Sequence, residues 1–149
     1  KYIMKKIYAF LLILLTSGCY NNNNIIEEMA GSHNEIRTNK NINILFLNEL
    51  LCDTAQNHAD WMAKNNKMVH EHGNSTPSRR VTESGYQWDE VGENIAYGYT
   101  SIDEVMKGWM NSKGHRDNIL NKGYLEFGIG VAYGKDDTPY YCVVFAHPE

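Results

Sequence analysis

The stretch FGIGVAYG (residues 127–134) decides how this chain folds. Large apolar residues alternate in it with glycine or alanine, and a period of two is that of a β-strand. One face of this strand is nearly bare, so another element must pack closely against it. After a turn at KDDTP (135–139), the continuous apolar run YYCVVFAH (140–147) predicts a second strand, in a sheet covered on both faces.

Amphipathic helices are predicted ahead of these strands. In FLNELLCDTAQNHADWMAKN (46–65), apolar residues recur at three- and four-residue steps, as on one face of a helix. His58 falls within that apolar stripe, so we interpret it as a hydrogen-bonded core residue. A later helix is expected to begin after Ser101, with Glu104 three residues on, and to end at Gly114.

A shorter helix is predicted within GSHNEIRTNK (31–40), where Ser32 and Glu35 have the spacing of a capping box. Helices early and in the middle of the chain, followed by strands, indicate an α+β domain built in layers. Residues 29–149 supply roughly 120 residues, which suits one such domain.

The start of the chain has the pattern of a secretory signal peptide. Lys5 and Lys6 precede a short apolar run, residues 7–15, and small residues follow it. The run is too short for a comfortable membrane span. The triplet Ser17-Gly18-Cys19 resembles a bacterial lipobox, which implies cleavage before Cys19 and attachment of lipid to it.

We therefore expect a signal peptide over residues 1–18, a lipidated Cys19 with an asparagine-rich tether over residues 19–28, and the domain over residues 29–149. An ordinary signal peptide with an incidental cysteine is the alternative. Either way the protein is expected to be extracytoplasmic, as a membrane-anchored lipoprotein or in secreted form.

Charge and cysteine content add two expectations. Removing residues 1–18 takes away three lysines and changes the formal net charge from -4 to -7, which argues against a nucleic-acid partner. Cys52 and Cys142 then form an even pair in an oxidising compartment. A disulfide and two free buried thiols are both open, and we favour free thiols because nothing in the sequence places the two Cα atoms within bridging distance.

Three glycine-containing segments each present an imidazole or a carboxylate. MVHEHG (68–73) carries His70 and His72, VGENIAYG (91–98) carries Glu93, and His115 directly follows Gly114. None of these motifs identifies a function or a family by itself, so we rely on their order along the chain.

In that order the chain resembles the CAP superfamily of cysteine-rich secretory, antigen 5 and pathogenesis-related proteins, and most of all its short bacterial members. The resemblance rests on HNEIR (33–37), residues 50–70, GENIAYG (92–98), VMKGWMNSKGHRDNIL (105–120), FGIGVAY (127–133) and VVFA (143–146). It implies an αβα sandwich with a central, mainly antiparallel sheet, and a surface cleft centred on two histidines and acidic residues.

Carried over residue by residue, the resemblance assigns His70, Glu93 and His115 to the cleft. Many eukaryotic members have a second glutamate just after the helix tryptophan, where this chain has Ser112. His72 is outside the family pattern, although in an extended stretch it would point the same way as His70 and complete a site differently.

Several functions stay open for this trio. Two imidazoles and one carboxylate suit Zn²⁺ or another divalent cation, with His70 and His115 as metal ligands together with Glu93. Hydrolysis would also need a general base, and we identify none. We place the interpretation of the trio as a hydrogen-bonded polar cluster that braces the loops ahead of metal binding, and metal binding ahead of catalysis.

A binding module is the function that we rank first. The resemblance implies lipid or sterol binding in some members and peptide contacts in others, and Tyr97 and Tyr99 flank the glutamate motif. Aromatic side chains with polar tips suit a wet groove for amphipathic ligands, although half-buried structural tyrosines would look the same. A metal-dependent hydrolase ranks second, and a structural protein of the cell envelope ranks third.

Overall fold

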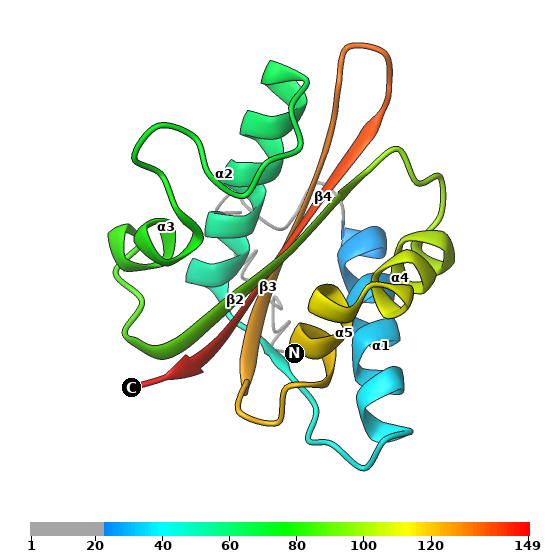
Figure 1. The fold of residues 1–149 in the computed structure, drawn as a ribbon, viewed down its shortest axis with the longest axis vertical. Helices are drawn as coiled ribbons and strands as arrows, with labels where there is room; N and C mark the ends of the chain where they lie inside the picture. Colours follow the sequence, from blue (N-terminus) through cyan, green and yellow to red (C-terminus); the bar gives the residue numbers. More distant parts are fainter. Residues whose placement is uncertain (1–22) are drawn as a thin grey trace, which may run out of the picture.

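A four-stranded sheet forms the middle of the computed structural model, which describes residues 23–149 (Figure 1). The strand order is β1-β3-β4-β2, with β4 antiparallel to both of its neighbours and β1 parallel to β3. The elements are α1 (Asn23–Thr38), β1 (Phe46–Leu47), α2 (Glu49–Asn65), α3 (Pro77–Glu83), β2 (Trp88–Tyr97), α4 (Ile102–Asn111), α5 (Lys113–Leu120), β3 (Glu126–Tyr133) and β4 (Pro139–Pro148).

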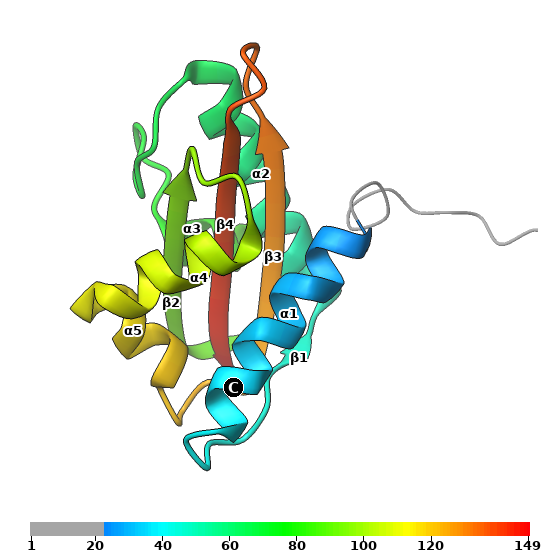
Figure 2. The same ribbon diagram turned by 90° about the vertical axis from the view of Figure 1, so that its right-hand side faces the viewer.

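Helices cover both faces of this sheet. Figures 1 and 2 show α2 and α3 on one face and α1, α4 and α5 on the other. Each face has its own apolar core, one around Trp109 and Phe127, the other around Leu51 and Val144. The α+β class and the αβα sandwich with a mainly antiparallel sheet are thus confirmed.

The bare face of β3 is covered by α2, as its sequence requires. A methyl group on Gly128 would collide with the backbone of Leu51, and one on Gly130 would collide with the α2 backbone at Ala55 and Gln56. The Gln56 side chain fixes the helix on the strand, because its amide donates to the Val131 carbonyl at 2.9 Å and accepts from the Val131 amide at 3.1 Å.

The first helix differs from the sequence prediction. It starts at Asn23, so Ser32 lies inside α1 instead of capping it, and residues 23–28 of the expected tether are helical. Ile26 and Met29 are buried in the core, and this burial extends the helix beyond the local capping signal. The expected signal peptide and Cys19 lie outside the described residues.

The helix after Ser101 begins as predicted but ends differently. The Ser101 hydroxyl accepts from the Glu104 amide at 3.3 Å, while α4 stops at Asn111 and α5 begins at Lys113. Gly114 is therefore inside α5 and does not end the preceding helix. The break is held by Arg116, whose Nη1 donates to the Met110 carbonyl at 2.9 Å and satisfies an end-of-helix acceptor.

Two further observations concern the cysteines and the helices. Cys52 and Cys142 are free and buried, which confirms the prediction of unbridged thiols. Across residues 23–149, no helix combines the length and the apolar character of a bilayer span.

We predict that the fold loses stability in mild acid through His33. Its ring is fully buried among Trp109, Phe127 and Phe145. Its Nδ1 donates to the Met29 carbonyl at 2.7 Å, and its Nε2 has no hydrogen-bond partner within residues 23–149. Burial lowers the pKa of His33 from 6.5 to about 4. The unfolded chain therefore binds the proton more tightly, so stability present above pH 6.5 should fall by about 3 kcal/mol as pH drops toward 4.

Urea unfolding between pH 7 and pH 4.5 measures this loss. In a His33→Phe variant the histidine contribution is absent, so its stability should depend less steeply on pH than that of the wild type. Parallel pH dependences for the two proteins would assign the acid sensitivity to other groups.

Candidate functional site

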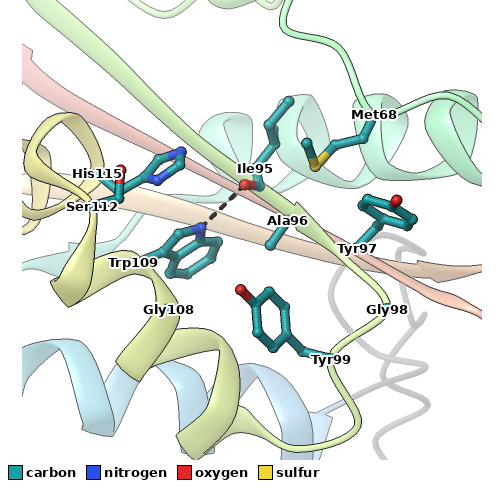
Figure 3. A pocket seen from close by; sticks show the side chains of 10 residues that line it. All are labelled: Met68, Ile95, Ala96, Tyr97, Gly98, Tyr99, Gly108, Trp109, Ser112 and His115. Atoms are coloured by element: carbon teal, nitrogen blue, oxygen red, sulfur yellow. Dashed lines mark hydrogen bonds between the residues drawn. The ribbon is translucent and has the colours of Figure 1, made fainter.

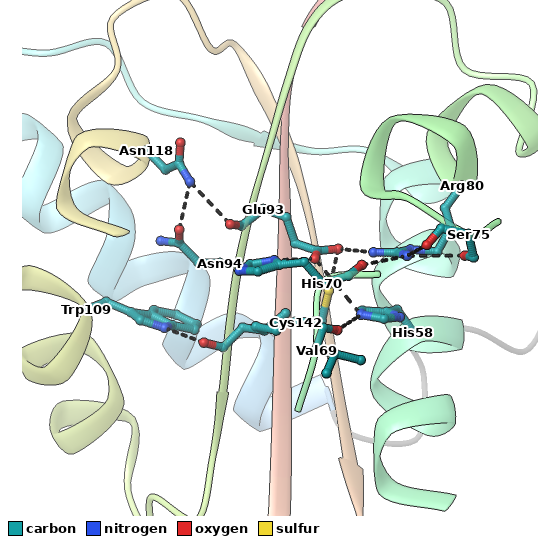
Figure 4. Close-up of polar contacts among 11 residues, drawn as sticks. His58, Val69, His70, Ser75, Arg80, Glu93, Asn94, Trp109, Asn118 and Cys142 are labelled. Carbon is teal, nitrogen blue, oxygen red and sulfur yellow. Dashed lines mark hydrogen bonds and ion pairs between the residues drawn. The ribbon is translucent and has the colours of Figure 1, made fainter. Parts of the chain in front are cut away.

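Glu93 on β2 is the centre of a buried polar cluster (Figure 4). Its Oε1 accepts from His70 Nδ1 at 2.8 Å, and its Oε2 accepts from Arg80 Nη2 at 2.6 Å. The Cys142 thiol on β4 also donates to Oε2, at 3.6 Å. The structure therefore brings His70 and Glu93 together and leaves neither carboxylate oxygen free.

Arg80 is a member of this cluster that the sequence did not reveal. Its Nη1 donates to the His70 carbonyl at 3.0 Å and to Ser75 Oγ at 3.2 Å, so one guanidinium holds both Glu93 and the loop that carries His70. The pair Thr76-Pro77 caps α3 and was an available signal for a helix there. No local pattern connects an arginine on that helix with Glu93.

The two other histidines near the cluster have structural roles. His58 is buried and its Nε2 donates to the Val69 carbonyl at 2.9 Å, as expected for a hydrogen-bonded core residue; it also lies 4.0 Å from Glu93 Oε1. The His72 ring stacks on Trp61, with 3.7 Å between ring centroids. His72 thus packs on α2 and does not share His70's contact with Glu93.

His115 comes to the same region from α5. Its carbonyl accepts from Asn94 Nδ2 at 3.0 Å, and Asn118 Nδ2 in turn donates to Asn94 Oδ1 at 2.9 Å and to the Glu93 carbonyl at 3.2 Å. These amides fasten α5 to β2. Among the described residues, the His115 ring itself has no hydrogen bond or ion pair, so it contacts neither His70 nor Glu93 through one.

A pocket of about 480 Å³ opens beside this cluster, between the end of β2 and α4 (Figure 3). Its side chains are mostly apolar or aromatic, with polar groups at its ends: Met68, Ile95, Tyr97, Tyr99, Trp109, Ser112 and His115. Trp109 is fixed in its wall, because Nε1 donates to the Ile95 carbonyl at 3.1 Å. Both tyrosines singled out in the sequence therefore line the pocket.

Comparison with known proteins identifies the family. The sequence pattern of the cysteine-rich secretory protein family, CAP, matches residues 31–145. This chain belongs to the CAP family. It is 32% identical over 111 residues to the uncharacterized membrane protein YlbC of Bacillus subtilis, an alignment that covers 72% of this chain and 30% of YlbC. The chain thus spans about a third of that relative's length.

Solved structures agree with this assignment. An outer surface protein of Borrelia burgdorferi superposes with a TM-score of 0.80 at 21% identity, covering 85% of this chain and 94% of the Borrelia protein. An extracellular SCP-domain protein of Bacillus anthracis gives a TM-score of 0.75 at 28% identity, covering 84% and 41%. NaASP2, solved with Zn²⁺, gives 0.61 at 15% identity, covering 86% and 83%. The CAP fold and membership of an extracellular family follow.

Electrostatics in this CAP domain keep Glu93 ionised. Burial by itself raises the pKa of Glu93, but the hydrogen bond from His70 and the charge of Arg80 outweigh it, and the net shift is downward. Glu93 is therefore a carboxylate that balances the Arg80 cation. Burial, and then the nearby His70, lower the pKa of His115, which favours its neutral imidazole.

The cluster does not match a three-ligand zinc site. Glu93 is bonded through both oxygens to Arg80 and His70, and residues 23–149 contain no group of three or more His, Cys, Asp or Glu side chains placed to hold a metal ion. His70 keeps Nε2 available, since Nδ1 is engaged and 48% of its side chain is exposed.

Proposed function

We propose that this CAP-domain protein is an extracytoplasmic binding protein, and that the pocket between β2 and α4 receives the apolar part of a small amphipathic ligand. The observation that supports this most is the composition of the pocket. Met68, Tyr97 and Tyr99 offer exposed apolar and aromatic surface over the buried Ile95 and Trp109, while the Tyr97 hydroxyl and His115 offer polar tips at its ends. A concave, largely preformed site with few convergent polar groups is typical of small-molecule binding.

Cys19 supplies a membrane anchor in this proposal. Lipid on Cys19 would leave only residues 20–22 between the anchor and α1, so the domain would be held close to the membrane surface. Such an anchor suits a protein that takes up amphipathic molecules there. The mass of the N-terminal peptide from a bacterial membrane fraction tests the modification, and an unmodified Cys19 would contradict it.

Filling the pocket should weaken ligand binding. Ser112 lines the pocket and its side chain makes no capping hydrogen bond, so a Ser112→Phe variant adds a ring to the cavity at little cost to the helix start. We expect it to bind n-octyl glucoside, used as an amphipathic probe, at least about tenfold more weakly than the wild type.

Titration calorimetry below the micellar concentration of the probe measures this. Lys113→Phe is the matched control, because Lys113 is the exposed neighbour and lies outside the pocket lining. The proposal is wrong if the wild type binds no probe, or if both variants bind as the wild type does.

Divalent metal binding by His70 and His115 is a second candidate. It is favoured by the Glu93–His70 hydrogen bond, since metal-binding histidines commonly donate their second ring nitrogen to a carboxylate. The related NaASP2 was solved with Zn²⁺. Glu93 is engaged by Arg80 and His70, so we do not assign it as the general base of a hydrolase.

Zinc titration should separate the histidines. His70→Ala and His115→Ala should each lose most zinc binding, whereas His147→Ala, at the far end of β4, should retain it. Both imidazoles must be neutral to bind, so affinity should decline in acid, and the lowered pKa of His115 moves its share of the decline to lower pH. Equal affinity in all three variants would exclude this site.

A further inference from the structure

A second hollow adjoins the pocket and differs from it in chemistry. It is an open depression of about 530 Å³ along α4, and the side chains that line it alone are polar: Thr100, Glu104, Lys107 and Asn111. Both hollows are lined by Gly98, Tyr99 and Gly108. The two hollows therefore meet at one place, and of the residues that they share only Tyr99 has a side chain.

The backbone of Tyr99 is fixed while its ring end is free. Tyr141 Oη donates to the Tyr99 carbonyl at 2.9 Å, and the amide of Gly98, which has a φ of 79°, donates to the Pro139 carbonyl at 2.9 Å. Among the described residues, the Tyr99 hydroxyl makes no hydrogen bond. Its ring can therefore change rotamer without breaking one.

The Tyr99 ring rests on Gly108, and only glycine permits this. Figure 3 shows the ring beside Gly108, directed from the loop after β2 toward Trp109. A Cβ atom on residue 108 would lie 2.5 Å from Tyr99 Oη and 2.9 Å from Cζ, well inside van der Waals contact. The ring is thus seated in the helix surface and forms the shared wall of both hollows.

We propose that Tyr99 is the specificity-determining residue of the ligand site: its ring, seated on Gly108, ends the apolar pocket and separates it from the polar hollow. This inference rests on the proposed binding function and names the ligand class more closely. The site takes a short alkyl chain that lies along the apolar pocket and ends against the Tyr99 ring.

A series of n-alkyl glucosides with six to twelve carbons tests the length limit. In the wild type, affinity should stop rising at the shorter chains because Tyr99 closes the pocket. Tyr99→Ala should shift the preferred length upward and strengthen binding of the decyl and dodecyl compounds about tenfold relative to the hexyl compound. Tyr99→Phe should retain the wild-type limit, because the ring remains.

The Gly108→Ala variant tests the contact between the Tyr99 ring and Gly108. The added methyl group should displace Tyr99 and change the length preference of the wild-type chain, but it should have no further effect in the Tyr99→Ala background. Gly114→Ala is the matched control, since nothing lies within 4 Å of a Cβ atom there.

The outcomes distinguish this inference from the proposed function. If Ser112→Phe blocks binding but Tyr99→Ala leaves the order of chain lengths unchanged, the pocket binds ligand and the role of Tyr99 is refuted. If the wild type binds none of the compounds, both the proposed function and this inference are wrong. Thermal melts verify that each variant is folded.

Discussion

Replacing Arg37 with methionine should lower the free energy of unfolding by about 3–5 kcal/mol. Arg37 on α1 is fully buried, and its guanidinium donates to four backbone carbonyls. Nε reaches Asn43 at 2.7 Å, Nη1 reaches Ile119 at 2.9 Å and Asn121 at 2.7 Å, and Nη2 reaches Tyr124 at 3.2 Å. Methionine fills a similar volume but leaves these acceptors without the guanidinium.

Denaturant unfolding monitored by tryptophan fluorescence measures the change. Arg79→Met is the matched control, because the Arg79 side chain forms a surface pair with Glu83 at 2.7 Å and is 55% exposed. Loss of that pair should cost under about 1 kcal/mol. Comparable small losses in both variants would mean that the four carbonyls find other donors and that Arg37 does not join α1 to the segment after α5.

A single methyl group at Gly128 should destabilise the protein by about 3 kcal/mol or more. The new Cβ atom would collide with the backbone of Leu51 and Cys52, and backbone cannot move aside as a flexible side chain can. Relief requires α2 to separate from β3, which opens the core around Leu51.

Thermal and denaturant melts of Gly128→Ala measure this effect. Gly31→Ala is the control: Gly31 lies on the exposed side of α1 with nothing within 4 Å of an added Cβ, so alanine there should leave stability unchanged or raise it slightly. A Gly128→Ala protein as stable as the wild type would mean that the α2–β3 contact is looser than the structure indicates.

Local pattern predicted most of the elements because burial repeats along a segment. The alternation at 127–133 identified β3 and its bare face, and the apolar stripe through His58 identified α2 with a core histidine. The helix cap at Ser101 could likewise be predicted, because Glu104 follows it by three residues. These patterns depend only on residues within one segment, so they can be read from a single sequence.

Boundaries and the site could be predicted only in part, for a different reason. Ser32 and Gly114 carry real local preferences, but the burial of Ile26 and the Arg116 contact with the end of α4 override them. The resemblance placed Glu93 and His70 in one cleft, yet it did not indicate that Arg80 would occupy the carboxylate. Tertiary contacts outweigh local preferences of about 1 kcal/mol.

The sequence by itself determined the layered α+β architecture, the family, and the requirement that a helix lie directly on Gly128 and Gly130. Only the tertiary structure decided what Arg37 and Arg80 bind, and that Tyr99 separates two hollows. The physical reason is that periodicity records which face of a segment is buried, whereas hydrogen bonds and cavities depend on the group that lies opposite. For Arg37 the carbonyl of Tyr124 is 87 residues away along the chain, and no local pattern spans that separation.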